Sequence, residues 1–336
     1  MKNLILMVML VSVFFQSSFA SIGENKIEDG SELGYSHEVA SFDSYSTLQN
    51  STSYSPSEPI YKAPYKSAAL AAGMSIFVPG MGHAYIGDMK TAGCLIGGVG
   101  CSFGAGSLGK DPAVHIPGSC LMSNTWMYGV YAAYRDARIF NGASHYSYKK
   151  MPHDSLFDLA TAPFRLSILK KPEVWGGVLC KLTAGIGVLY LYSQMAMHSG
   201  IPVHSSRGSS VMPFMAFPIG IGEEALFRGY LQPQISEAFG SPAAGLILSS
   251  FAFGGAHLLN TLNMDEQDRR DYCTYSIPFL ICSGFYYGWL ANKNCSLKEA
   301  VAVHALYDFT LFGLGAAFGG EDSIWEKHDF SMSIPF

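Results

Sequence analysis

Eight apolar blocks follow one another through most of this chain, and no other feature limits its fold so strongly. Several of them are only about 17 residues long, which is the lower limit for an α-helix that crosses the hydrocarbon core of a bilayer. The series predicts an all-α, polytopic membrane helical bundle of about eight transmembrane helices. The second block is rich in glycine, so a re-entrant segment is the alternative there. The blocks lie at residues 67–83, 91–107, 116–134, 174–195, 211–231, 242–260, 275–292 and 296–318.

The composition supports a membrane protein and argues against a nucleic-acid partner. Of the 336 residues, 49% are hydrophobic and 14% are charged, whereas about 25% of an average soluble domain is charged. The formal net charge is −5, so no basic surface for nucleic acid is expected and membrane lipid is the expected partner. The seven cysteines are scattered through mostly apolar stretches, which indicates buried thiols rather than a disulfide or zinc framework.

The first 64 residues differ in character from the rest. Residues 1–20, "MKNLILMVMLVSVFFQSSFA", combine an early lysine, an apolar run and small residues before the expected cut. This pattern predicts a secretory signal peptide cleaved after Ala20, with an uncleaved anchor as the alternative. Residues 21–64 are rich in Ser, Tyr, Glu and Pro and poor in aliphatic residues. We expect them to form a largely disordered exported linker.

Two independent signals give the same orientation in the membrane. Lysine and arginine are most frequent between residues 135 and 171, and such loops face the cytoplasm. Counting three spans back from this loop places residue 66 outside, as the signal peptide requires. The protein is therefore expected to be a multi-pass protein of a bacterial-type inner membrane.

Three formal charges interrupt the fifth block, in "IGEEALFRGYLQ" at residues 221–232. An ionised group at mid-membrane costs several kcal/mol, so such groups normally face a protein interior. In a helix Glu224 and Arg228 share a face and can form an ion pair. Glu223 points about 100° away and needs another partner. A buried ion pair that only fixes helix packing explains these charges as well as catalysis does.

Two histidines in later blocks favour a catalytic interpretation. His257 follows Phe253 by one turn, and His304 precedes Asp308 by one turn. At about 1.5 Å per residue, Glu224 and His304 lie about 10–12 Å from the cytoplasmic ends of their spans, and His257 lies nearer the middle. A carboxylate and two imidazoles on three helices are harder to explain as packing than any of them alone.

These motifs, in this order, resemble the CPBP or Abi family of intramembrane proteases, which includes the type II CAAX prenyl endopeptidases. The resemblance covers about residues 170–320 and implies a peptide-bond hydrolase. It implies that Glu223 and His257 activate a water molecule, while His304 and Asp308 stabilise the oxyanion. Glu224 and Arg228 would support Glu223, whose burial makes it a plausible general base. Family members often have Asn where this chain has Asp308, and an ionised carboxylate cannot donate to an oxyanion. Asp308 is therefore either protonated or a partner that orients His304.

A metal is left open. Glu223, His257 and His304 would make a chemically sensible zinc set with an open fourth position. The His-Glu-x-x-His spacing of soluble zinc proteases is absent. The sequence therefore establishes no cofactor and leaves zinc open, and we favour direct activation of water by glutamate and histidine.

The remaining expectations are less specific. Residues 65–150 form a separate N-terminal membrane domain of unknown role, in which Pro79 and Gly80 break a helix and His83 has a structural role. Lys181 is expected to snorkel to the membrane surface. The expected substrate is a membrane-associated peptide or protein of unknown identity. A non-catalytic scaffold of the bacteriocin-immunity type and a carrier are the alternative functions.

Overall fold

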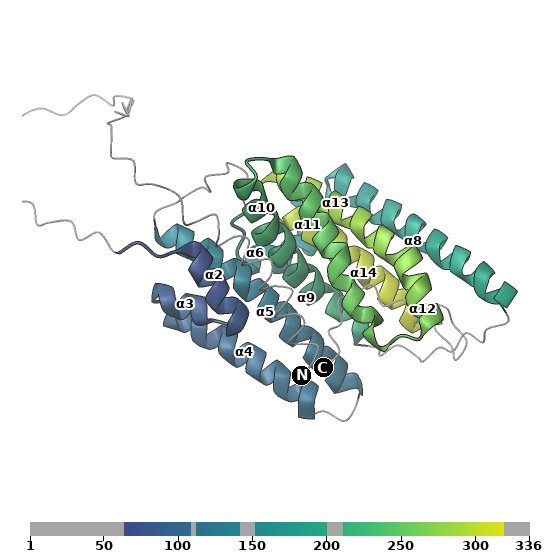
Figure 1. Cartoon of the computed structure of the whole chain (residues 1–336), viewed down its shortest axis with the longest axis horizontal. Coiled ribbons are helices and arrows are strands. Elements are labelled where there is room, and N and C mark those ends of the chain that lie inside the picture. Colours follow the sequence, from purple (N-terminus) through teal and green to yellow (C-terminus); the bar gives the residue numbers. More distant parts are fainter. Residues whose placement is uncertain (1–63, 109–111, 142–151, 200–210, 319–336) are drawn as a thin grey trace, which may run out of the picture. The chain divides into compact units, whose positions relative to one another are not determined.

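The structure is a computed structural model, and it describes residues 64–108, 112–141, 152–199 and 211–318. The predicted signal peptide and nearly all of the predicted linker lie outside these residues. Lys66–Phe336 forms one compact unit, and its described elements are all helical (Figure 1). The α-helices are α2 (Ala68–Phe77), α3 (Met81–Ile86), α4 (Met89–Leu108), α5 (Pro112–Phe140), α6 (Leu156–Thr161), α7 (Leu166–Leu169), α8 (Pro172–Ser199), α9 (Met212–Glu224), α10 (Gln232–Ala238), α11 (Pro242–Ala256), α12 (Glu266–Asp271), α13 (Ile277–Asn294) and α14 (Lys298–Phe318). Between them lie the 3₁₀-helices η2 (Ala162–Phe164) and η4 (His257–Asn263) and the π-helices η3 (Ala225–Leu231) and η5 (Tyr272–Ser276).

The first apolar block is not one continuous helix. α2 ends at Phe77 and α3 begins at Met81, so the helix break predicted at Pro79 and Gly80 is confirmed. Gly80 has a φ of 82°, and a Cβ there would lie 2.6 Å from the carbonyl oxygen of Ala92. Because of both constraints, this turn requires glycine.

The other apolar blocks coincide with helical segments. Block 211–231 runs from α9 through η3 without a break, and block 242–260 runs from α11 into η4. The glycine-rich block 91–107 lies within the uninterrupted helix α4, which does not support a re-entrant segment. By length and composition, Pro242–Leu262 is the one helix among the described residues that is long and apolar enough to cross a membrane. The predicted number of eight crossings therefore stays a prediction.

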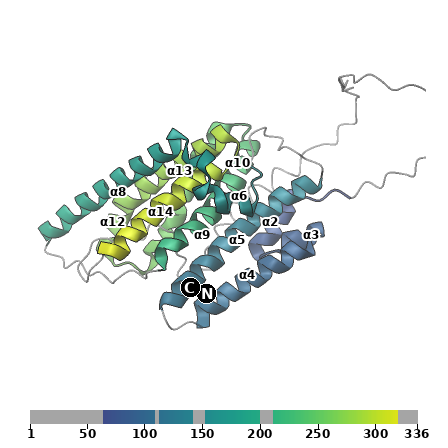
Figure 2. The same cartoon turned by 180° about the vertical axis from the view of Figure 1, so that it is seen from behind.

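Helices α2 to α5 pack against one another and contain a partly buried contact between a histidine and a carboxylate (purple to teal-blue in Figures 1 and 2). The fully buried His83 places Nε2 3.2 Å from Oδ2 of Asp136. Arg135 holds the same carboxylate with hydrogen bonds of 2.7 and 3.1 Å. These contacts tie α3 to α5, which is consistent with a structural role for His83.

Two glycines allow α5 to pack closely against the helix that carries Glu223. A Cβ at Gly222 would lie 2.5 Å from Oδ1 of Asn124, and one at Gly229 would lie 2.5 Å from a ring carbon of Tyr131. Small residues of this kind let membrane helices approach each other closely. We call Gly222 and Gly229 the glycine seam. Both pairs of partners are seven residues apart, so the two helices run in the same direction, as the predicted topology requires of its third and fifth spans.

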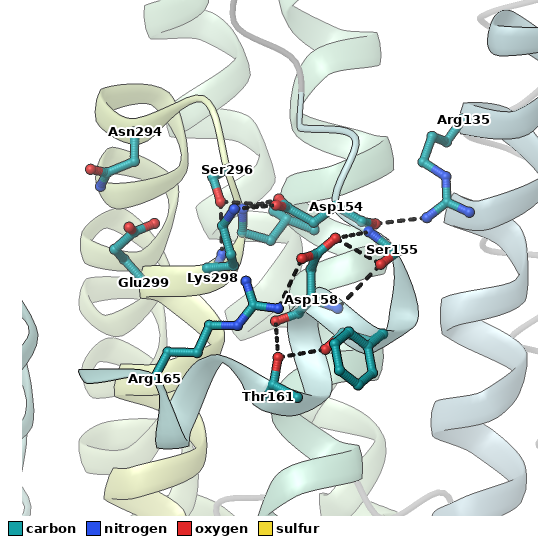
Figure 3. Close-up of polar contacts among 12 residues, drawn as sticks. Arg135, Asp154, Ser155, Asp158, Thr161, Arg165, Asn294, Ser296, Lys298 and Glu299 are labelled. Carbon is teal, nitrogen blue, oxygen red and sulfur yellow. Dashed lines mark hydrogen bonds and ion pairs between the residues drawn. The ribbon is translucent and has the colours of Figure 1, made fainter. Parts of the chain in front are cut away.

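The start of α14 is held by the loop that follows α5 (Figure 3). The Asp154 carboxylate accepts hydrogen bonds from the Leu297 N–H (2.7 Å) and the Ser296 hydroxyl (3.1 Å), and it lies 3.2 Å from Nζ of Lys298. A carboxylate at this position also interacts favourably with the helix dipole. Arg135 of α5 donates a 2.7 Å hydrogen bond to the Asp154 carbonyl. Asp154 therefore joins the end of α5 to the start of α14.

We expect Gly222→Ala to lower the free energy of unfolding by about 1–3 kcal/mol, because the new methyl group forces α5 and α9 apart. Thermal unfolding of the purified protein in detergent measures this effect. Gly187→Ala is the matched control, since nothing lies within 4 Å of a Cβ at that position of α8. Equal melting temperatures for the two variants would contradict the close packing at the seam.

Candidate active site

The residues predicted to form the site lie in three separate helical stretches, and all are buried. Glu223 and Glu224 end α9, Arg228 lies in η3, and His257 begins η4. His304 and Asp308 lie in α14. Each side chain is at most 3% exposed. The six residues are Glu223, Glu224, Arg228, His257, His304 and Asp308.

The Glu224 carboxylate is the centre of the hydrogen-bond network. Its Oε1 accepts a 3.3 Å hydrogen bond from Arg228 and lies 2.8 Å from Nδ1 of His304. The predicted pairing of Glu224 with Arg228 is therefore confirmed. Since an ionised carboxylate only accepts hydrogen bonds, Nδ1 of His304 donates the second one. Glu224 thus links the helix of the first motif to α14, a contact that the sequence does not predict.

The helix changes its winding directly after the two glutamates. α9 ends at Glu224, and the π-helix η3 carries Arg228. Single π-turns within longer helices occur frequently at functional sites. With this winding, the Arg228 guanidinium still reaches Glu224, and its Cζ lies 4.2 Å from the ring centroid of Phe253. The cation is therefore held by a carboxylate and by the face of an aromatic ring.

The other ring nitrogen of His304 faces two more carboxylates. Nε2 lies 3.2 Å from Oδ2 of Asp308 and 3.7 Å from Oε2 of Glu223. A nitrogen lone pair and carboxylate oxygens are all acceptors, so this arrangement requires a proton on Nε2 or on one of the carboxyl groups. The cluster is therefore arranged to hold and to move a proton. Asp308 contacts His304 directly, as expected for a partner that orients the imidazole.

Aromatic side chains fix the plane of the His304 ring. Tyr287 of α13 stacks on it with ring centroids 4.7 Å apart and planes 12° apart. Phe253 of α11 meets it edge-on, with centroids 6.1 Å apart. Because both rings are fully or almost fully buried, they keep the imidazole in one orientation while the carboxylates bind its two nitrogens.

His257 reaches the cluster through Phe253. Its ring centroid lies 4.8 Å from that of Phe253, and its Nδ1 lies 2.8 Å from the Phe253 carbonyl oxygen. A carbonyl only accepts, so Nδ1 is the donor, and Nε2 of the neutral ring bears a lone pair. Such a nitrogen can take a proton from water. α11 ends at Ala256, and His257 is the first residue of the 3₁₀-helix η4 that continues it.

Comparison with known proteins identifies the same part of the chain. Residues 207–310 match the family model of the type II CAAX prenyl endopeptidases, Rce1-like. This Rce1-like segment contains all six predicted site residues and covers less than half of the chain. The resemblance predicted over residues 170–320 is therefore confirmed within residues 207–310. The chain has no match among curated proteins or solved structures.

The Rce1-like segment does not gather the predicted zinc ligands into a metal site. Within the described part of the chain, no group of three or more His, Cys, Asp or Glu side chains has an arrangement that could hold a metal ion. His304 instead directs its two ring nitrogens at carboxylates. Zinc stays a prediction, and no step below depends on it.

One neighbour of the site lies outside the Rce1-like segment. Lys181 of α8 is only 8% exposed, so the expectation that it snorkels to the surface is wrong. Its Nζ donates a hydrogen bond to the Tyr287 hydroxyl and lies 3.9 Å from the ring centroid of Tyr307. Its spacing from Gly177 and Gly185, four residues on either side, is the sequence signal that could have identified it.

We expect Arg228→Met to lower the free energy of unfolding by about 3–5 kcal/mol, because it leaves the buried Glu224 without its cation. Chemical or thermal unfolding in detergent measures the loss. Restoring part of the lost stability with Glu224→Gln in the same chain would identify the unpaired carboxylate as the cause.

A second ion pair of the same chain provides the control for this experiment. Arg270 and Glu266 have the same spacing along a helix and the same 3.3 Å separation, but both side chains are exposed. Arg270→Met should therefore change stability by less than about 1 kcal/mol. Similar losses for Arg228→Met and Arg270→Met would contradict the buried pair.

Proposed function

We propose that this protein is an intramembrane endopeptidase that hydrolyses a peptide bond with a water molecule activated by Glu223 and His257. The observation that carries the proposal is the buried cluster in which Glu223, Glu224 and Asp308 surround His304, inside the segment with the Rce1-like match. A membrane-associated peptide or protein in a bacterial-type inner membrane is the proposed substrate.

The first proposed step is proton removal from water. Glu223 accepts the proton, and the lone pair on Nε2 of His257 assists it. The water oxygen then bonds to the carbonyl carbon of the scissile amide, whose C=O electrons move to oxygen. Because the site is buried, the developing negative charge needs a positioned donor. In this proposal Nε2 of His304 carries a proton and donates a hydrogen bond to the oxyanion, while Glu224 holds Nδ1 and Asp308, beside Nε2, orients the ring.

In the second step the tetrahedral intermediate collapses. The C–N bond breaks, the oxyanion returns to a carbonyl, and the proton held by Glu223 passes to the leaving amine. Arg228 and His304 both donate to Oε1 of Glu224, so the three side chains hold one another in place. In this proposal Glu223 exchanges protons, whereas Glu224 and Arg228 keep His304 in position.

A non-catalytic scaffold, for example a bacteriocin-immunity protein, is the second candidate. The observation that favours it is the fully buried ion pair of Glu224 and Arg228, which packing alone could explain. A carrier with an intramembrane polar site is a weaker alternative. The behaviour of Glu223 separates these functions.

We expect Glu223→Gln to abolish cleavage while the protein stays folded, because the amide has a similar shape and cannot accept the proton. Quantitative proteomics of membranes that contain wild-type or variant protein measures accumulated substrates and lost fragments. Elemental analysis of both purified proteins tests the zinc expectation independently. Glu266→Gln, at a side chain that is 89% exposed, should leave the proteome unchanged. A folded Glu223→Gln protein with an unchanged set of fragments would refute the protease proposal.

We expect Asp308→Asn to retain activity within about tenfold of wild type, because an amide can still hydrogen-bond to Nε2 of His304. Asp308→Leu removes this contact and should lose substantially more activity. Cleavage rates of the membrane substrates found with Glu223→Gln, together with melting temperatures, distinguish the two variants. If a folded Asp308→Asn protein is inactive, the role assigned to Asp308 is wrong.

A further inference from the structure

One face of α8 lies against the candidate site, although α8 precedes the Rce1-like segment. Gly177, Lys181 and Gly185 are spaced four residues apart and so lie on one side of this helix. A Cβ at Gly177 would lie 2.3 Å from the ring of Tyr286, and one at Gly185 would lie 2.8 Å from the Tyr307 hydroxyl. The two glycines therefore bring α8 close to α13 and α14 (Figure 1). Lys181 lies midway between the two glycines on this helix.

The Lys181 amine is enclosed by buried aromatic side chains. Its Nζ lies 3.9 Å from the ring centroid of Tyr307 and 4.4 Å from that of Tyr287. Both rings are at most 1% exposed. Rings in this position stabilise a desolvated ammonium group electrostatically. The amine also donates a hydrogen bond to the Tyr287 hydroxyl, which makes Tyr287 its direct partner in the site.

Tyr287 connects Lys181 with the His304 imidazole of the proposed protease site. Its ring stacks on His304 with ring centroids 4.7 Å apart. A group that fixes the Tyr287 hydroxyl therefore also fixes the ring on which His304 rests. Cζ of the Arg228 guanidinium lies 5.3 Å from the centroid of the same ring. Two cations from different helices thus act on one tyrosine, in a cluster that contains three carboxylates.

We propose that Lys181 is a positioning residue of the active site, which holds the Tyr287 phenol and thereby keeps the stacked His304 in its reactive orientation. The inference rests on the proposed protease function for its kinetic consequence. The contact between Lys181 and Tyr287 does not depend on that function, so it can be tested without a substrate.

The structural test uses 3-fluorotyrosine incorporated at position 287 of the full chain and read by ¹⁹F NMR in detergent. Lys181→Met replaces the amine by an apolar chain of similar length, so the resonance should shift because the phenol loses its donor. Lys181→Arg retains a donor and should restore most of the wild-type shift. Lys293→Met is the control, since Lys293 is largely exposed and bonds to Glu173. An unchanged resonance in Lys181→Met would overturn the proposal.

Tyr287→Phe provides a second variant in case Lys181→Met does not fold. It removes only the hydroxyl and leaves the stacked ring. The neighbouring Tyr286→Phe is its control, because Tyr286 donates instead to the Glu173 carbonyl on α8. The kinetic test uses a fluorogenic peptide that contains the cleavage sequence identified with Glu223→Gln.

We expect Lys181→Met and Tyr287→Phe each to lower kcat at least about tenfold with KM nearly unchanged, since a charge-assisted hydrogen bond contributes enough to support such a loss. The double variant should be no slower than the slower single variant, because the two residues act through one contact. If the losses in kcat of the two single variants multiply in the double variant, or if only KM changes, the positioning role is overturned. Absence of cleavage by the wild-type protein would refute the protease proposal and leave the NMR result as the test of the contact.

Discussion

The whole candidate site depends on one buried carboxylate that binds two cationic or donor groups. Glu224 accepts from Arg228 on its own helix and from His304 on α14. Each of these buried groups would be costly without the others. Their mutual satisfaction explains how a chain with few charges can concentrate several of them in its interior. It also explains why α9 and α14 must pack with the register that they have.

Three sets of contacts with the surrounding helices stabilise the register between α9 and α14. The glycine seam brings α5 against α9 and η3, while Gly177 and Gly185 bring α8 against α13 and α14. Asp154 fixes the start of α14 and receives a hydrogen bond from the end of α5 (Figure 3). Between these contacts, the aromatic rings of Tyr287 and Phe253 leave His304 one orientation. Rigid support of this kind is what a preorganised hydrolytic site needs.

Much of this arrangement could be predicted from the sequence because its signals are local. The apolar blocks predict most of the helical segments, and the four-residue spacing predicts the Glu224–Arg228 pair. The π-helix after Glu224 could not be predicted, because the spacing of its apolar residues does not distinguish a π-helix from an α-helix. The bond from His304 to Glu224 joins positions 80 residues apart, so no spacing rule contains it. The position of Lys181 near the end of a span does not reveal its burial, whereas Gly177 and Gly185 on the same helix face indicate a close helix contact there.

The glycine seam has a consequence for how the chain can be divided. The segment with the family resemblance begins at residue 207, but the surface of its first helix is shaped to receive Asn124 and Tyr131. In an isolated C-terminal fragment, Gly222 and Gly229 would face lipid instead of α5. Acyl chains could not reproduce the Asn124 and Tyr131 side chains that pack against them. The helices before the Rce1-like segment therefore supply part of the surface against which the helix with Glu223 packs.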